Sequence, residues 1–541
     1  MAGFNKTSVP GVDIPDWRPL STLVTASSSG ASIAEDMRNT DDRNPTIFYL
    51  ASATSLQKIN PVGNGNSTTI ISPALAGTFG IGTQIRQMES RGPRGVLAAG
   101  GTTTTIVLST ALPAAVGTNM LADRGDGKGF KVRIINYVTG KIQERVCIAN
   151  TAGTTPTIEL DSALDSAPNL NDGYEFLSGR VYMLNAGTVV AGLWKYYDIL
   201  TQSMSGNLAT TNLPFSIGTD TAIECMDESH VPWDKIPGEG FVVGASTYDS
   251  ARLRCLLATG MAAGTITGQA AAGDADVLAN EYRNFQIRVV EDTVTPTSVG
   301  QRRIIASHTA GPSPVYTLQA NWTVTPSANA KFVIENPNYI LVHTSASAST
   351  YTYAQDAIGS MTADTWNTTQ FVALPATIGY GVMSFQSYGI SLDTAKNNRY
   401  SNVFVFRGGS TVTLYRLDIA GGATGAVFTE TYGSMSSVLF TTGASLAYDS
   451  VCNDGKYAYI VFGAVPQTYR FNVYTRQLVP WAMFMFAHST VVGGNKAAIK
   501  SMFTTTTSSN LRLTKDPTEK QTSFVQVRCS GTEVFESFIT V

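Results

Sequence analysis

The sequence predicts an all-β protein, in which a β-propeller-like body of about six blades carries two homologous small β-domains inserted in loops. Helix-type spacing of apolar residues is almost absent. Short β-branched and aromatic runs dominate instead, separated by Gly, Asn, Asp, Ser and Pro. Two kinds of internal repeat, one short and one long, supply the rest of the evidence.

Residues 1–40 are expected to form an extended N-terminal arm, because they are polar, aperiodic and interrupted by three prolines. Fraying at the terminus and ordering on a neighbouring subunit are both open for this arm. The propeller body is expected over residues 41–96, 181–255 and 337–541. Its apolar runs are nearly continuous, which favours strands buried on both faces. These runs are Thr46–Leu50, Val181–Leu184, Tyr339–Val342, Val403–Phe406 and Tyr457–Phe462.

The short repeat is a strand that ends in an apolar residue followed by Asp or Asn. It occurs at Lys58-Ile59-Asn60, Tyr196-Tyr197-Asp198, Arg416-Leu417-Asp418 and Arg470-Phe471-Asn472. Asp418 and Asn472 are 54 residues apart, and removing the first long module from the Asn60–Asp198 interval leaves about the same spacing. A period of 40–55 residues is typical of a four-stranded propeller blade. The runs Phe524–Arg528 and Phe538–Val541 could close the ring; a stack of separate β-sandwiches is the alternative.

The long repeat is a module expected at residues 97–180 and again at 256–336. Both copies contain the same motifs in the same order. These are Phe-x-Val/Ile-Arg, then Gln-x-Arg, then Thr-Ala-Gly, and finally a strand with aromatic residues. The matched segments are Phe130–Arg133 with Phe285–Arg288, Gln143–Arg145 with Gln301–Arg303, Asn150–Gly153 with His308–Gly311, and Leu121-Ala122 with Leu278-Ala279. We expect Arg133 and Arg288, and likewise Arg145 and Arg303, to play the same local role, each bonding across its own sheet.

The composition limits the functions open to this chain. Charged residues make up only 14% and the net charge is −3, which argues against sequence-specific nucleic-acid binding. No apolar run reaches the length of a membrane span, and the N-terminal residues lack the apolar region of a secretory signal, so membrane insertion is not expected. The five cysteines lack CxxC spacing and the four histidines lack metal-ligand spacing, so neither a disulfide framework, a metal site nor a cofactor is predicted.

No catalytic residue is predicted either. Phosphate-loop and nucleophile-elbow motifs are absent, and the carboxylates Asp161/Asp165, Asp227/Glu228 and Glu291/Asp292 are interpreted as loop acids. The glycine-rich segment Asp123–Gly129, which contains Arg-Gly-Asp, lacks the spacing of a calcium loop. Core packing is favoured over sugar stacking for Trp194, Trp233, Trp322, Trp366 and Trp481. The sequence therefore predicts a protein that is not an enzyme.

The inserted module resembles a β-module of tailed-phage virion proteins. The resemblance lies in Gln-x-Arg, Thr-Ala-Gly and Trp322-x-x-x-Pro326, and the segments Pro15–Leu20 and Ser90–Gly95 also look like phage structural proteins. It implies a structural subunit of the tail or neck, in a nozzle-type or collar-type homo-oligomeric ring with other tail and neck proteins. Assembly in the bacterial cytoplasm and residence in the virion follow from it. The alternatives are a head-decorating or receptor-binding protein that contacts host glycan and, more remotely, a propeller glycan hydrolase.

Overall fold

The computed structural model describes the chain in segments that together cover the propeller and both inserted domains. The described residues are 18–21, 33–35, 47–52, 55–59, 68–70, 84–88, 91–125, 127–135, 142–184, 194–205, 221–226, 253–268, 279–280, 282–311, 313–328, 330–335, 339–354, 363–367, 371–379, 382–387, 402–419, 426–433, 445–449, 457–461, 467–483, 499–504, 521–528 and 534–540.

The body consists of six antiparallel sheets, each with four strands in meander order and one with an additional short strand. Blade 1 contains β2 (Ile33–Glu35), β3 (Ile47–Ser52), β4 (Ser55–Ile59) and β5 (Thr68–Ile70). Blade 2 contains β6 (Gln84–Met88), β13 (Arg180–Leu184), β14 (Trp194–Asp198) and β15 (Ser203–Met204). Blade 3 contains β16 (Ala222–Met226), β23 (Tyr339–Thr344), β24 (Ser349–Ala354), β25 (Thr365–Trp366) and β26 (Val372–Ala373).

The remaining blades follow the same order. Blade 4 contains β27 (Met383–Ser387), β28 (Asn402–Phe406), β29 (Thr413–Asp418) and β30 (Ala426–Thr431). Blade 5 contains β31 (Ser445–Asp449), β32 (Tyr457–Val461), β33 (Gln467–Asn472) and β34 (Gln477–Met483). Blade 6 contains β35 (Ile499–Thr504), β36 (Gln521–Arg528), β37 (Val534–Thr540) and, from the other end of the chain, β1 (Arg18–Ser21).

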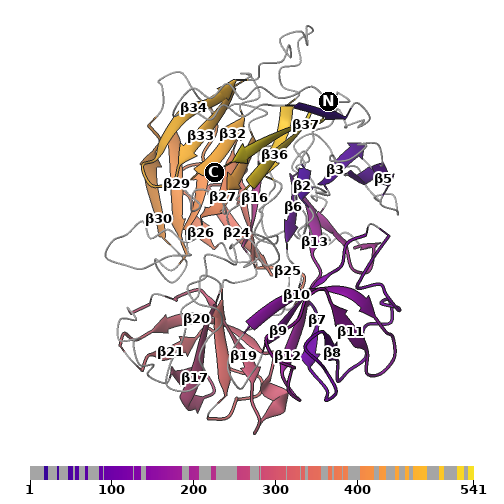
Figure 1. Cartoon of the computed structure of the whole chain (residues 1–541). Helices are drawn as coiled ribbons and strands as arrows, with labels where there is room; N and C mark the ends of the chain where they lie inside the picture. Colours follow the sequence, from indigo (N-terminus) through magenta and orange to yellow (C-terminus); the bar gives the residue numbers. More distant parts are fainter. Residues whose placement is uncertain are drawn as a thin grey trace.

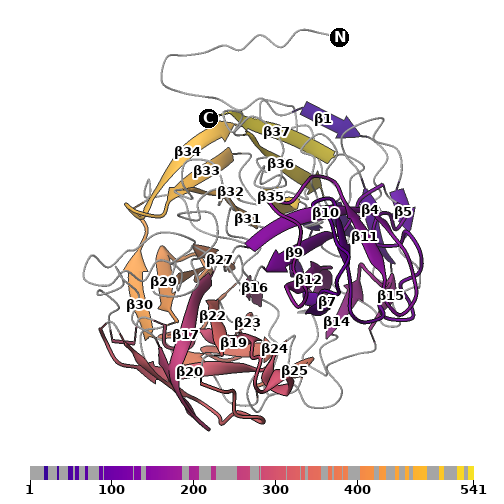
Figure 2. The ribbon, with the colours of Figure 1, turned by 60° about the horizontal axis from the view of Figure 1, so that its bottom comes forward.

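The first strands of the blades form a closed ring, since β2, β6, β16, β27, β31 and β35 contact one another in that order and β35 contacts β2. This arrangement confirms the predicted six-bladed propeller (Figures 1 and 2). The ring closes because β1 pairs antiparallel with β37, so that blade 6 joins both ends of the chain. The expected N-terminal arm over residues 1–40 is corrected at β1 and β2, whose backbones are propeller strands despite their polar sequence.

The five apolar runs found in the sequence form the second strands of blades 1 to 5, namely β3, β13, β23, β28 and β32. A second strand has a strand on each side and a neighbouring blade on each face, so both faces need apolar residues. All six residues of β23 and all five of β28 are buried. Apolar clusters between successive blades result, and the largest rings of one of them are Tyr182, Trp194 and Tyr353.

The short repeat marks the end of the third strand, in β4, β14, β29 and β33. In blades 2 and 5, the Asp or Asn side chain accepts hydrogen bonds from the turn that follows. Asp198 Oδ1 accepts from the Thr201 amide at 2.9 Å, and Asn472 Oδ1 accepts from the Tyr474 and Thr475 amides at 2.9 and 3.1 Å. Four residues after each acceptor the backbone is left-handed, at Gln202 (φ 53°) and Arg476 (φ 58°). The repeat is therefore a turn signal; Asn60 lies outside the described residues.

Two small barrels are inserted in the body, as predicted. The first barrel contains β7 (Arg91–Val96), β8 (Thr105–Val107), β9 (Lys131–Ile135), β10 (Ile142–Asn150), β11 (Thr157–Leu160) and β12 (Gly173–Leu177). The second barrel contains β17 (Leu253–Ala262), β18 (Thr265–Gly268), β19 (Gln286–Glu291), a 3-10 turn η3 (Pro296–Ser298), β20 (Arg302–His308), β21 (Val315–Leu318) and β22 (Lys331–Glu335).

Both barrels have the same strand order. The first reads β7-β12-β9-β10-β11-β8, and a bridge between Leu97 and Leu108 joins its ends; the second closes as β17-β22-β19-β20-β21-β18. Each barrel lies between the first and second strands of its blade, β6 and β13 or β16 and β23. Because these connections are on the same face of adjacent blades, both barrels project from one side of the propeller, below it in Figure 1.

The barrel sheets begin earlier than the expected module starts at residues 97 and 256. β7, which precedes residue 97, pairs with β12, and β17 starts at Leu253. The expected bounds were based on the matched motifs, and both strands lie before the first of these motifs. The sequence therefore placed the start of each module too late.

A conserved corner in the two barrels corrects one detail of the predicted alignment. Asn119 (φ 61°) accepts from the Asn150 amide, and Asn280 (φ 65°) accepts from the His308 amide. The Leu121 amide donates to Asn150 Oδ1 at 2.8 Å, and the Tyr282 amide donates to His308 Nε2 at 2.9 Å. Leu121 therefore corresponds to Tyr282 rather than to Leu278. The segment Asp123–Gly129 is consequently a longer connection that only the first barrel has.

Candidate functional site: the interface between the inserted barrels

Arg145 and Arg303 have the same local role, as the sequence predicts. Arg145 donates to the carbonyls of Ala163 (2.8 Å) and Glu144 (2.8 Å). Arg303 donates to the carbonyls of Asn321 (2.7 Å) and Arg302 (2.6 Å), and its guanidinium covers the Trp322 ring. Each arginine thus holds the loop after strand β11 or β21 within its own barrel, and neither contributes to the interface described next.

The second arginine pair lies where the two barrels meet. In the first barrel, Arg133 on β9 donates to Glu144 on β10 at 2.8 Å and lies 3.9 Å from Glu175 on β12. The strand register explains this contact, because Arg133 is directly opposite both Glu144 and Glu175, and directly opposite side chains share one face. All three side chains are at most 3% exposed.

Glu175 also contacts the second barrel. Its carboxylate lies 3.5 Å from Arg288 on β19 and 3.9 Å from Arg302 on β20, and Arg94 on β7 approaches it to 3.8 Å from the exposed side. Arg288 and Arg302 are themselves opposite each other in the β19–β20 register and are buried. Arg288 has a role that the sequence did not predict, because its ion pair with Glu175 crosses to the other barrel.

This cluster of charged side chains can hold the two barrels in a fixed relative position. A buried carboxylate is stable only where cations and hydrogen bonds compensate its lost hydration, and here four guanidinium groups surround it. Removing one of these arginines leaves the buried carboxylate with less compensation. The sequence contained a signal for this site that the motif comparison passed over: at one matched position the first copy has Glu144 and the second has Arg302.

The candidate carboxylate pairs have structural roles where they are described. Asp161 accepts from the Val146 amide at 2.9 Å, and the Asp165 amide donates to Gln143. Asp292 accepts five hydrogen bonds from four residues in two loops, the one after β19 and the one after β21, and is 4% exposed. Asp227 and Glu228, and the side chain of Glu291, lie outside the described residues.

The described tryptophans pack inside the molecule. Trp194 and Trp366 stand 5.3 Å apart between blades 2 and 3, and Trp322 is 5% exposed in the core of the second barrel. Beside the first two, Arg180 donates to Asp364 at 2.9 Å, and Tyr353 donates to the same carboxylate oxygen. Burial raises the pKa of Tyr353, and the neighbouring Tyr182 and Asp364 raise it further, so its hydroxyl keeps the proton that it donates. Trp233 and the side chain of Trp481 are outside the described residues.

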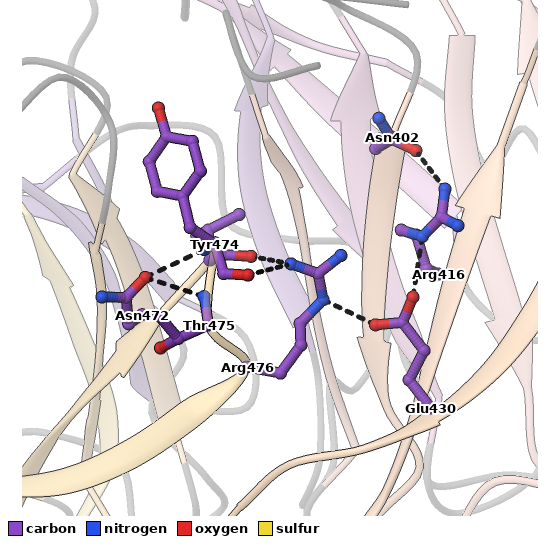
Figure 3. A network of polar contacts seen from close by, with 8 residues as sticks. Asn402, Arg416, Glu430, Asn472, Tyr474, Thr475 and Arg476 are labelled. Atoms are coloured by element: carbon purple, nitrogen blue, oxygen red, sulfur yellow. Dashed lines mark hydrogen bonds and ion pairs between the residues drawn. The ribbon is translucent and has the colours of Figure 1, made fainter. Parts of the chain in front are cut away.

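A second polar network connects blades 4 and 5 (Figure 3). Glu430 on β30 accepts from Arg416 at 2.9 Å and from Arg476 at 2.6 Å. Arg476 sits in the turn after β33 and also donates to the carbonyls of Val473 and Tyr474. The bond from Arg476 to Glu430 therefore links the third-to-fourth-strand turn of blade 5 to the outer strand of blade 4.

The residues that could hold a metal are dispersed in the described part of the chain, where no three or more His, Cys, Asp or Glu side chains come together. Cys147 is free and buried, and burial raises its pKa. Within the same residues no helix is long and apolar enough to cross a membrane.

Comparisons with known proteins show similarity of fold only. No protein family model and no curated protein sequence matches the chain. Among solved structures, an α-L-arabinanase of Penicillium chrysogenum is 7% identical with a TM-score of 0.31, over 97% of this chain and 99% of that one. An α-L-arabinofuranosidase of Fusarium graminearum is 8% identical with a TM-score of 0.24, over 98% and 97%. An auxiliary nutrient binding protein of Bacteroides ovatus is 10% identical with a TM-score of 0.24, over 83% and 98%.

The prediction that the chain is not an enzyme needs correction, because the matching structures include enzymes as well as a nutrient binding protein. Two of the matching structures are glycan-cleaving enzymes. The prediction was based on absent sequence motifs and scattered acids, and such evidence misses a site assembled from distant blades. At identities of 7% and 8%, the similarity concerns the fold and says nothing about the activity of this chain.

Proposed function

We propose that this protein is a structural subunit of a tailed-phage virion, located in the tail or neck as part of a ring of several copies. One observation carries the proposal: the same barrel occurs twice, at equivalent positions of adjacent blades, and the two copies are locked together by a buried ion cluster. A closed propeller with one fixed double projection suits a subunit that must present the same surface in every copy of an assembly.

The sequence motifs of the barrels give the proposal its phage context. Gln-x-Arg holds a loop in both barrels, through Gln143 with Arg145 and Gln301 with Arg303. The partners proposed are other copies of the chain and the neighbouring tail or neck proteins. The virion is the proposed location.

Electron microscopy of virions labelled with antibodies against the two barrels tests the proposal. We expect label at the tail or neck, and rings when the purified chain is imaged at high concentration. Label on the head would replace the tail position by the head-decorating alternative. A chain that stays monomeric and is missing from virions would overturn the proposal.

A further inference from the structure

The two barrels use the same face for their contact, but the charges on that face differ. The strand registers equate Arg133 with Arg288, Glu144 with Arg302, and Glu175 with Val333. At these three positions the first barrel has one arginine and two glutamates, whereas the second has two arginines and one valine. The duplicated module therefore has an acidic version and a basic version.

This difference matters because the charged side chains that carry it are buried. Glu144 and Glu175 in the first barrel are at most 4% exposed, and Arg288 and Arg302 in the second are at most 5% exposed. Pairing two acidic versions would place four carboxylates at one contact, and pairing two basic versions would place four arginines there. Like charges placed side by side repel each other, so both like-with-like pairs are disfavoured.

We propose that this face is a pairing surface that accepts only a barrel of the opposite version, and that Glu144, Glu175 and Arg302 determine the choice. Each acidic barrel then pairs with the basic barrel of its own chain, which its tether holds at high effective concentration. The inference deepens the proposed function in one respect: in a ring of subunits, like barrels of neighbouring chains meet often, and the charge code keeps them from pairing.

Exchanging the residues between the versions in the full-length chain tests the proposal. Glu144→Arg with Glu175→Val gives the first barrel the residues of the second, and Arg302→Glu with Val333→Glu does the reverse. Hydrogen exchange of the amides in β9, β12, β19 and β20 reports the contact, while β8, β11, β18 and β21 report whether each barrel is folded. Glu159→Arg on β11, an exposed acid of the first barrel, is the matched control.

We expect each exchange alone to lower protection at the contact at least tenfold, the control to change nothing, and all four changes together to restore protection. Glu175→Gln removes one charge and keeps nearly the same shape. It should lower protection at the contact and leave protection in β8, β11, β18 and β21 unchanged. This variant serves as the test if one of the double substitutions unfolds its barrel. Unchanged protection in Glu175→Gln or in the single exchanges would overturn the proposal, as would failure of the combined exchange with both barrels folded. These measurements use the purified chain, so they are independent of where the protein lies in a virion.

Discussion

At the scale of single residues, buried polar side chains fix loops of the second barrel and join two strands of blade 3. Asp292 accepts hydrogen bonds from the Val294, Thr295 and Ser327 amides and from the Ser298 and Ser327 hydroxyls, at 2.6 to 3.1 Å. His343 in blade 3 is fully buried, with Nδ1 2.8 Å from the Thr350 hydroxyl. Both residues make stability depend on pH.

Replacing Asp292 by Asn is expected to destabilise the second barrel by about 2–3 kcal/mol, because an amide offers one acceptor oxygen to donors that now bind two. Burial raises the pKa of Asp292, but the hydrogen bonds from Ser327, Thr295 and Ser298 outweigh it and lower the pKa. A lowered pKa contributes stability above the unfolded value of about 3.9, and this contribution is lost as pH falls through the folded value. Urea unfolding at pH 7 and pH 3 measures both effects. Equal losses at both pH values would contradict this account.

His343 is expected to destabilise the protein at acidic pH. Burial lowers its pKa to about 3, from an ordinary value of about 6.5. The unfolded chain therefore binds a proton that the folded chain excludes, and stability falls as pH drops from 6.5 toward 3. The full loss is on the order of 5 kcal/mol. Denaturant titrations at pH 7, 5.5 and 4.5 measure this loss. Between pH 7 and pH 4.5, the free energy of unfolding should fall less in His343→Gln than in the unmodified chain. Equal decreases in both proteins would show that other groups control acid sensitivity.

At the scale of elements, the turns within a blade are specified by nearby residues. The strand pairing that closes the ring is specified by residues far apart in the sequence. The Asp or Asn at the end of a third strand fixes its turn through bonds within four residues. In contrast, β1 pairs with β37, more than 500 residues away. Such a distant pairing has a larger chain-closure cost than a turn, so the closing blade depends on the rest of the ring.

Deleting residues 1–21 is expected to remove β1 and expose the edge of β37. The amides of β37 that pair with β1 should then exchange at least tenfold faster, and the exposed edge should favour association between chains. Hydrogen exchange compared between β37 and β28, a second strand in blade 4, measures the effect with an internal control. Full protection of β37 in the truncated chain would mean that β1 adds nothing to closure.

At the scale of the whole molecule, the two barrels join the propeller in different ways. The second barrel has an apolar core of its own, whereas the apolar core of the first barrel is continuous with residues of blades 1 and 2. The second barrel contacts the propeller through Asn284, which donates to the Ile419 carbonyl at 2.6 Å, and contacts the first barrel through Glu175. Inserted domains of this kind add little loop-closure cost to the body.

Replacing residues 253–335 by a short Gly/Ser linker should therefore leave the propeller folded, because β16 and β23 still pair directly. The first barrel should stay folded, with faster exchange on the face that the second barrel covered, because the uncovered Glu175 regains hydration and keeps Arg133 and Arg94 as partners. Hydrogen exchange in β23 and β28 reports the propeller, and exchange in β9 and β12 reports the first barrel. Lost protection in β28 would show that the second barrel is part of the propeller core.

Local sequence patterns predict most of the strands, the six-blade ring and the duplicated barrels. These features depend on local patterns: apolar runs for strands with two covered faces, Asp or Asn at third-strand ends, and the ordered motifs of the two modules. The role of β1 and β2 was not predictable from the polar residues 1–40, because pairing with a distant strand leaves no periodic signal in a three- or four-residue segment.

Only the tertiary structure decided which charged residues form a site. Glu175 and Arg302 are 127 residues apart, and each sits in a strand whose pattern says only that it is β. They meet because the two barrels are inserted at equivalent positions of adjacent blades and turn the same face toward each other. A salt bridge between distant residues depends on the placement of whole domains, and residue patterns within a strand do not encode that placement.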